Sequence, residues 1–124
     1  MVRVFKTRSF TRFMRKEGLT DDALRDAVSR AERGLIDADL GSGVIKQRVA
    51  RRGQGRSGGY RTLIAFKAAE RSVFLFGFAK RDQDNIDAGE LRILRRAAAE
   101  MLSWSEKQIA AMLATGAWRE VDWP

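Results

Sequence analysis

The chain has 124 residues, of which 44% are hydrophobic and 32% charged, and its formal net charge is +8. This length predicts a single domain over residues 1–124. Cysteine and histidine are both absent, which excludes disulfides, thiolate chemistry, and the commonest general base and metal ligand. No apolar run approaches the roughly 18 residues of a membrane span. The N-terminus has no signal-peptide core, so we expect a cytoplasmic protein that uses no membrane, metal or cofactor.

The first part of the chain predicts one strand and two helices. Residues 2–6 alternate between apolar and polar side chains, as an edge strand does. Ser9 is expected to cap a short helix that ends at Gly18. A second helix is expected to begin after the cap residue Thr20 and to end at Gly34.

The middle of the chain predicts strands. Residues 40–43 contain two glycines and predict a turn. Residues 44–49, 60–67 and 71–80 are rich in β-branched and aromatic side chains, which predicts three strands. The third contains an apolar run at 73–79, which is typical of a central strand buried on both faces.

The last part predicts two helices with strong start signals. Asp87 with Glu90, and Ser105 with Gln108, have the spacing of capping boxes. Residues 117–121 are expected to form a short strand or a tail. The predicted fold class is therefore α+β, with a small antiparallel sheet of about four strands and with N-terminal and C-terminal helices packed on it.

The distribution of charge is the main indication of function. Between residues 40 and 69 there are seven cations and no acidic residue: Lys46, Arg48, Arg51, Arg52, Arg56, Arg61 and Lys67. Glycines separate the cations in the middle of this stretch. A cationic, glycine-rich loop between two strands suits a polyanion such as RNA or DNA.

Three of these cations suggest a way to cleave RNA without metal or histidine. The RNA 2′-hydroxyl is a built-in nucleophile, so a protein has to align it, stabilise negative charge and assist proton transfer. Lys46 and Arg48 share one strand face because side chains alternate along a strand, and Arg61 arrives from the next strand. Arginines bind phosphate oxygens with a planar fork, and neighbouring cations favour proton release from a lysine. The alternative from spacing alone is a passive binding face.

An ordered series of motifs resembles a known family. The series runs from the basic strand at 44–51 through Gly58-Gly59-Tyr60-Arg61 and Phe78-Ala79-Lys80-Arg81 to Asn85-Ile86. It is similar to the RelE/HigB-like toxins of bacterial type II toxin–antitoxin systems, within the RelE/ParE superfamily. The resemblance covers residues 35–115.

The resemblance implies a fold, an activity and partners. The fold is a microbial-ribonuclease-like α+β domain. The activity is that of an mRNA endonuclease, or mRNA interferase, which inhibits translation, usually by cutting mRNA on the ribosome. The partners are mRNA and a co-encoded antitoxin, expected to be a helix-turn-helix protein. That antitoxin would anchor on the first two helices or on the C-terminal helix with Trp118. The alternative for Trp118 is that it packs on the domain.

The resemblance also implies site residues. The catalytic residues expected from the matching motifs are Lys46, Arg48, Arg61 and Arg81. Residue type and position, apart from the resemblance, predict RNA-binding residues beside them: Arg51, Arg52, Arg56, Tyr60 and Lys80. The alternatives are a solvated charged loop for the three arginines and a core or rim position for Tyr60. Other members often place a tyrosine or histidine soon after the last of the catalytic arginines, but residues 82–86 contain neither. Lys46 is therefore the default candidate for proton transfer.

Two other functions fit the sequence. A ParE-like toxin would inhibit a protein target such as DNA gyrase and would leave transcripts intact. A non-catalytic RNA-binding protein would bind RNA with a steep salt dependence and would leave it uncut.

Overall fold

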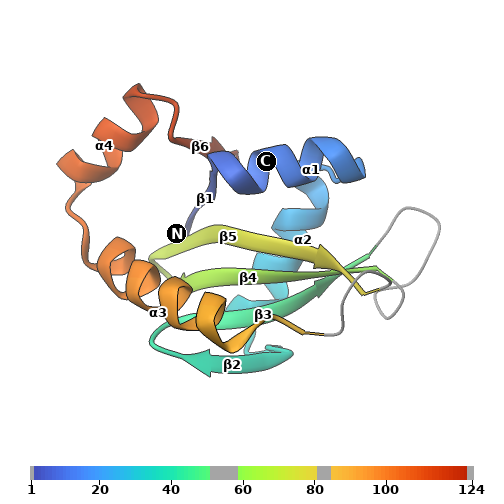
Figure 1. The fold of residues 1–124 in the computed structure, drawn as a ribbon. Coiled ribbons are helices and arrows are strands. Elements are labelled where there is room, and N and C mark those ends of the chain that lie inside the picture. The colour runs from blue at the N-terminus through green and yellow to red at the C-terminus, as the bar shows by residue number, and fades with distance from the viewer. Residues whose placement is uncertain (1, 51–58, 81–84, 123–124) are drawn as a thin grey trace.

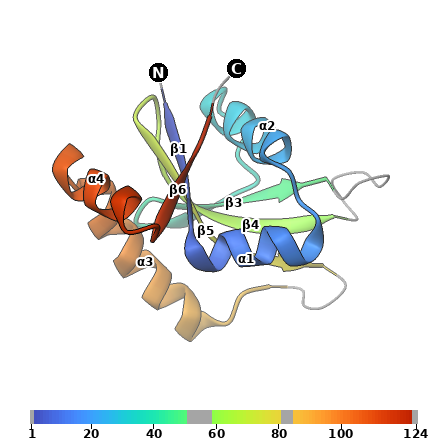
Figure 2. The same cartoon turned by 90° about the horizontal axis from the view of Figure 1, so that it is seen from above.

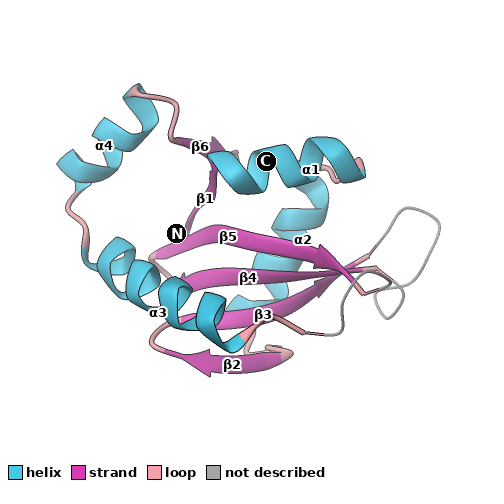
Figure 3. Cartoon of the chain, in the orientation of Figure 1, coloured by secondary structure: helices cyan, strands magenta, loops and turns pink. Residues whose placement is uncertain are grey.

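The computed structural model describes residues 2–50, 59–80 and 85–122, and shows helices packed on both faces of one sheet (Figure 1). In chain order the elements are β1 (Arg3–Thr7), α1 (Arg8–Glu17), α2 (Asp21–Glu32), β2 (Ala38–Gly41), β3 (Val44–Val49), β4 (Tyr60–Lys67), β5 (Arg71–Ala79), α3 (Ala88–Ser103), α4 (Glu106–Ala114) and β6 (Trp118–Val121). Figure 3 distinguishes the helices from the strands by colour. The α+β class is confirmed.

The sheet is larger than expected. Its six strands lie in the order β2-β3-β4-β5-β1-β6, so the expectation of about four strands is wrong. All pairs are antiparallel except β1 and β5, which are parallel. The N-terminal strand is therefore an interior strand and not an edge strand. The two edge strands, β2 and β6, have only four residues each, too few to show a clear period.

The expected turn at residues 40–43 is shorter than predicted. Leu40 and Gly41 belong to β2, and the chain reverses at Ser42 and Gly43, whose φ angles are 54° and 84°. Both angles lie in the left-handed region, which glycine adopts most readily. The tight turn leaves β2 paired with β3, with Ala38 opposite Lys46.

The helix starts follow local hydrogen bonding. Thr7, and not Ser9 as expected, caps α1, because its side chain accepts a hydrogen bond from the Phe10 amide. Thr20 caps α2 as predicted. Ser105 forms a complete capping box at α4. These bonds satisfy backbone amides that a helix leaves unpaired at its first turn.

The two faces of the sheet carry separate apolar cores. Side chains of α1 and α2, including Phe10 and Leu24, pack with Ile64 on one face. Side chains of α3 and α4, including Ala98 and Ile109, pack with Leu63 on the other. In Figure 1, α3 crosses in front of the strands and α2 lies behind them. Adjacent residues of β4 therefore point into different cores, as the alternation of a strand requires.

Trp118 is part of the second core. It is 2% exposed, and its ring centroid lies 5.3 Å from that of Phe5 and 5.2 Å from that of Trp104. Of the two alternatives for Trp118, the structure supports packing on the domain and not an exposed surface for a partner.

Candidate functional site: a cationic pocket on strands β3 and β4

Lys46, Arg48 and Arg61 meet on one face of the sheet. Lys46 and Arg48 are two residues apart on β3, and Arg61 lies directly opposite Arg48 on β4. The three side chains line one pocket of about 240 Å³, together with Asp37 and Ala38. Two positive charges facing each other across a strand pair destabilise a sheet. Their juxtaposition is what a site for an anion requires.

Asp37 is the carboxylate of this pocket. One of its oxygens, Oδ2, accepts a hydrogen bond of 2.6 Å from the Arg48 backbone amide, and Oδ1 lies 3.3 Å from the Arg48 guanidinium. The hydrogen bond between the Arg48 guanidinium and Asp37 orients the Arg48 side chain, which is still 46% exposed. Arg48 therefore retains donors for a ligand while one side of its guanidinium is fixed.

Two buried residues hold Asp37 in turn. Gln47 is fully buried, and its Oε1 accepts a hydrogen bond of 2.8 Å from the Asp37 amide. Arg30, from α2, is 8% exposed, lies 3.7 Å from Asp37 and donates to the Arg48 carbonyl. These contacts connect the pocket to the α1–α2 side of the sheet.

The carboxyl group of Asp37 is held in its ionised form. Partial burial opposes ionisation, but the backbone and side-chain hydrogen bonds from Arg48, with the charges of Arg48 and Arg30, outweigh it. The pKa of Asp37 is therefore lowered from its ordinary value. Asp37 acts here as a fixed negative charge that orients Arg48.

Lys46 differs from the other two cations. Within the described residues, its ammonium group makes no hydrogen bond or ion pair. Lys46 is half-buried and lies between Ala38 on one side and Leu63 on the other. Its ammonium group is therefore available to a ligand in the pocket.

The other predicted cations are not among the described residues that line the pocket. Lys80 is exposed, directly follows β5 and is not among the residues that line the pocket. Four predicted residues lie outside the described part of the chain: Arg51, Arg52, Arg56 and Arg81. Residues 51–58 connect the end of β3, which carries Arg48, to the start of β4, which carries Arg61.

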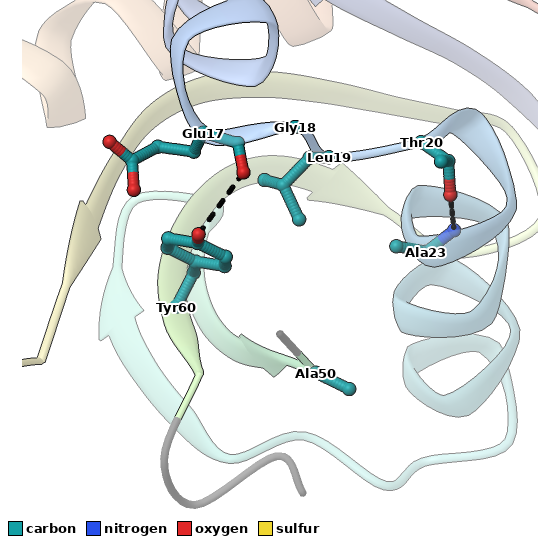
Figure 4. A pocket seen from close by; sticks show the side chains of 7 residues that line it. All are labelled: Glu17, Gly18, Leu19, Thr20, Ala23, Ala50 and Tyr60. Atoms are coloured by element: carbon teal, nitrogen blue, oxygen red, sulfur yellow. Dashed lines mark hydrogen bonds between the residues drawn. The ribbon is translucent and has the colours of Figure 1, made fainter. Parts of the chain in front are cut away.

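Tyr60 lies on the opposite face of the sheet and does not join the pocket. It is 2% exposed, and its hydroxyl donates a hydrogen bond of 3.2 Å to the Glu17 carbonyl (Figure 4). Its ring packs edge-on against Phe13, with centroids 5.6 Å apart. Tyr60 and Arg61 are consecutive residues of β4, and side chains alternate along a strand, so the two point to opposite faces of the sheet. The expected role in RNA binding does not fit this buried position.

A second pocket adjoins Tyr60. It measures about 500 Å³ and is bounded by the turn between α1 and α2, including Leu19, and by Ala50 at the end of β3 (Figure 4). Among the described residues, its lining provides one carboxylate, Glu17, and no cation.

Asp37 was missed by the sequence analysis. It lies three residues before the stretch 40–69 that has no acidic residue. Its segment was not predicted to form a strand paired with β3. The signal was present in residues 37–41, since a strand there and a tight turn at Ser42 bring Asp37 beside Arg48. This segment contains Asp37 and Asp39, and aspartate has little β-propensity, so the signal is weak.

Metal-binding clusters and membrane-spanning helices are both absent from residues 2–50, 59–80 and 85–122. In that part of the chain, no three His, Cys, Asp or Glu side chains gather closely enough to hold a metal ion. No helix there is long and apolar enough to cross a membrane.

Comparison with known proteins identifies the family. A family model described as the RelE toxin of the RelE/RelB toxin–antitoxin system matches residues 2–121. Comparison with curated proteins and with solved structures gives no significant match. The match spans nearly all of the fold, from β1 to β6, and includes every residue of the cationic pocket. The chain therefore belongs to the family of RelE toxins of toxin–antitoxin systems.

Proposed function

We propose that this toxin is an endoribonuclease that cuts mRNA, on the ribosome, and so inhibits translation. The observation that carries the proposal is the pocket in which Lys46, Arg48 and Arg61 converge from two neighbouring strands. The described residues that line the pocket include three cations and one carboxylate, a net charge of +2, which suits a phosphodiester.

The proposed reaction is attack of the RNA 2′-hydroxyl on the adjacent phosphorus. A bond forms between the 2′ oxygen and phosphorus, and the bond to the 5′ oxygen of the next nucleotide breaks. The products are a 2′,3′-cyclic phosphate and a 5′-hydroxyl. The proton of the attacking hydroxyl passes to water, and the leaving oxygen takes a proton from an acid.

Each cation has a role in this reaction. Arg61 and Arg48 donate hydrogen bonds to the non-bridging phosphate oxygens, whose negative charge grows in the transition state. Lys46 has an ammonium group with no partner in the described residues, and it donates the proton to the leaving oxygen. Asp37 keeps Arg48 in place and takes no part in proton transfer, because its pKa is lowered.

The experiment compares growth after induced expression of the wild type and of two variants, Lys46→Ala and Arg61→Ala. The matched control is Lys107→Ala, which removes an exposed cation of α4. We expect growth arrest with cleaved transcripts in primer extension for the wild type and the control. Each pocket variant is expected to lose both, because loss of one charge-stabilising donor lowers the rate by about 100-fold or more.

Two results would contradict the proposal. Equal arrest by all four proteins would show that the pocket cations are not catalytic. Arrest with a DNA-damage response and intact transcripts would indicate a protein target such as gyrase.

The family pairs with an antitoxin, and the pocket constrains how that partner acts. An antitoxin that covers the pocket has to bring a carboxylate to Lys46, because an unpaired buried cation is strongly destabilising. We expect an acidic segment in the antitoxin at that contact.

A further inference from the structure

The outward face of α1 is a second cationic surface. Arg8, Arg12, Arg15 and Lys16 recur at the spacing that places them on one side of a helix. All four are exposed, whereas Phe10 and Met14 on the opposite side are buried. We call these four residues the α1 stripe. Figure 2 shows α1 on the outside of the molecule.

The stripe is not explained by the stability of the helix. Cations stabilise the C-terminal turn of a helix, where Arg15 and Lys16 lie, but they are unfavourable near the N-terminus, where Arg8 lies. Within the described residues, none of the four makes an ion pair. Neighbouring cations on one helix face repel each other. An anionic ligand would relieve that repulsion.

The stripe continues onto the neighbouring edge strand. Arg15 of α1 and Arg119 of β6 line one hollow of about 280 Å³ together with Lys6 and Asp21. Lys6 and Asp21 neutralise each other through an ion pair of 2.7 Å. In the described part of the chain Arg119 makes no ion pair, so this hollow has an excess of positive charge.

We propose that the α1 stripe and Arg119 bind the phosphate backbone of double-stranded RNA. This surface is separate from the cationic pocket, because α1 packs on the other face of the sheet. It therefore adds an RNA contact beyond the proposed cleavage site. The choice of RNA over DNA rests on the proposed function.

The composition of the stripe favours a nucleic acid over a protein. Protein interfaces have an apolar core, with charged residues depleted at the centre. The exposed large hydrophobic residues within the described chain are Leu35, Ile36 and Ile93, and none of them is on α1. A surface of cations alone matches contacts to phosphate groups, which position a backbone without reading sequence.

The composition also favours a double strand over a single strand. Surfaces for single strands combine cations with aromatic side chains on which bases stack. The two aromatic residues of α1 are both directed inward. Phe10 is buried against Phe74, and Phe13 packs against Tyr60.

The test is fluorescence anisotropy with an RNA duplex of about 20 base pairs, across about 50 to 200 mM KCl. The stripe variant combines Arg12→Gln, Arg15→Gln and Lys16→Gln. The control variant combines Arg92→Gln, Arg96→Gln and Lys107→Gln, which removes three exposed cations from α3 and α4. Both variants lose the same charge, and thermal unfolding verifies that both are folded.

We expect the stripe variant to bind the duplex at least about tenfold more weakly, with a salt slope smaller by about 2 to 3. The control variant is expected to stay close to the wild type. A duplex does not allow in-line attack by the 2′-hydroxyl, so binding is measured whether or not the protein cleaves RNA.

Three results would overturn the proposal. Equal weakening in both variants would show an effect of net charge alone. Loss of binding to a DNA duplex of the same sequence, with RNA binding retained, would assign the stripe to DNA. Binding of polyglutamate as tight as that of RNA at equal salt, lost in the stripe variant, would assign it to an acidic protein.

Discussion

Strands β3 and β4 present two faces with opposite roles. On one face, Lys46, Arg48 and Arg61 form a pocket open to a ligand. On the other face, Gln47 and Tyr60 are buried and hydrogen-bonded. The residues of the two faces alternate one by one along the same strands.

This difference predicts that adjacent residues of one strand affect function and stability separately. A substitution of Lys46 or Arg61 on the pocket face removes a positive charge and is expected to change activity more than stability. A change on the buried face leaves polar groups without partners and destabilises the sheet. Substitutions of adjacent residues are therefore expected to have different readouts.

The largest effect is expected for Arg61→Lys. The charge is kept, but the planar fork that binds two phosphate oxygens is lost. We expect the cleavage rate on ribosome-bound mRNA to fall by about 100-fold or more. The midpoint of urea unfolding should hardly change, and a large drop in that midpoint would show that Arg61 belongs to the fold instead.

Gln47→Leu is expected to act on stability. The Gln47 side chain donates to the Ala27 and Leu35 carbonyls and accepts from the Asp37 amide. Leucine leaves these groups without partners, so we expect a loss of about 2 to 4 kcal/mol in the free energy of unfolding. Urea denaturation measures this loss. A variant as stable as the wild type would contradict the structural role.

A smaller effect is expected for Tyr60→Phe. The change removes one hydrogen bond to the Glu17 carbonyl and keeps the ring against Phe13. We expect about 1 kcal/mol of destabilisation, with the cleavage rate within about twofold of wild type. If cleavage is lost while stability is retained, Tyr60 contacts RNA after all.

Asp37→Asn is expected to change the pH dependence of stability. The pKa of Asp37 in the folded state lies below its ordinary value of 3.8. The ionised carboxylate therefore stabilises the fold above pH 3.8, and this contribution disappears as the pH falls through the lower folded pKa. The wild type should be more stable than the variant at neutral pH, and the gap should close in acid. Thermal unfolding at several pH values measures the gap, and a gap independent of pH would contradict the assignment.

The strands and helices with strong local signals were predictable. Residues 44–49 and 60–67 form strands within the predicted limits, because their β-branched and aromatic content is high. The caps at Thr20 and Ser105 were predicted from residue type and spacing. Pairing two predicted strands also placed Arg61 on the side of Lys46 and Arg48.

The rest depends on tertiary contacts. Strands β2 and β6 are too short for a period, and they exist because β3 and β1 provide partners. The parallel pairing of β1 with β5 joins residues far apart in the chain and leaves no local signal. Asp37 was not predicted as a site residue, because the strand β2 that follows it was not predicted. Tyr60 was predicted as a site residue, but the alternation of side chains along β4 places it on the opposite face of the sheet.

The most direct test is cleavage of a ribosome-bound mRNA that carries a single 2′-deoxynucleotide at the site of cutting. The wild type is predicted to cut the unmodified message, to leave a 2′,3′-cyclic phosphate and a 5′-hydroxyl, and to spare the deoxy message. The Lys46→Ala variant should cut neither. Cleavage of the deoxy message, or ends with a 3′-hydroxyl and a 5′-phosphate, would contradict the account.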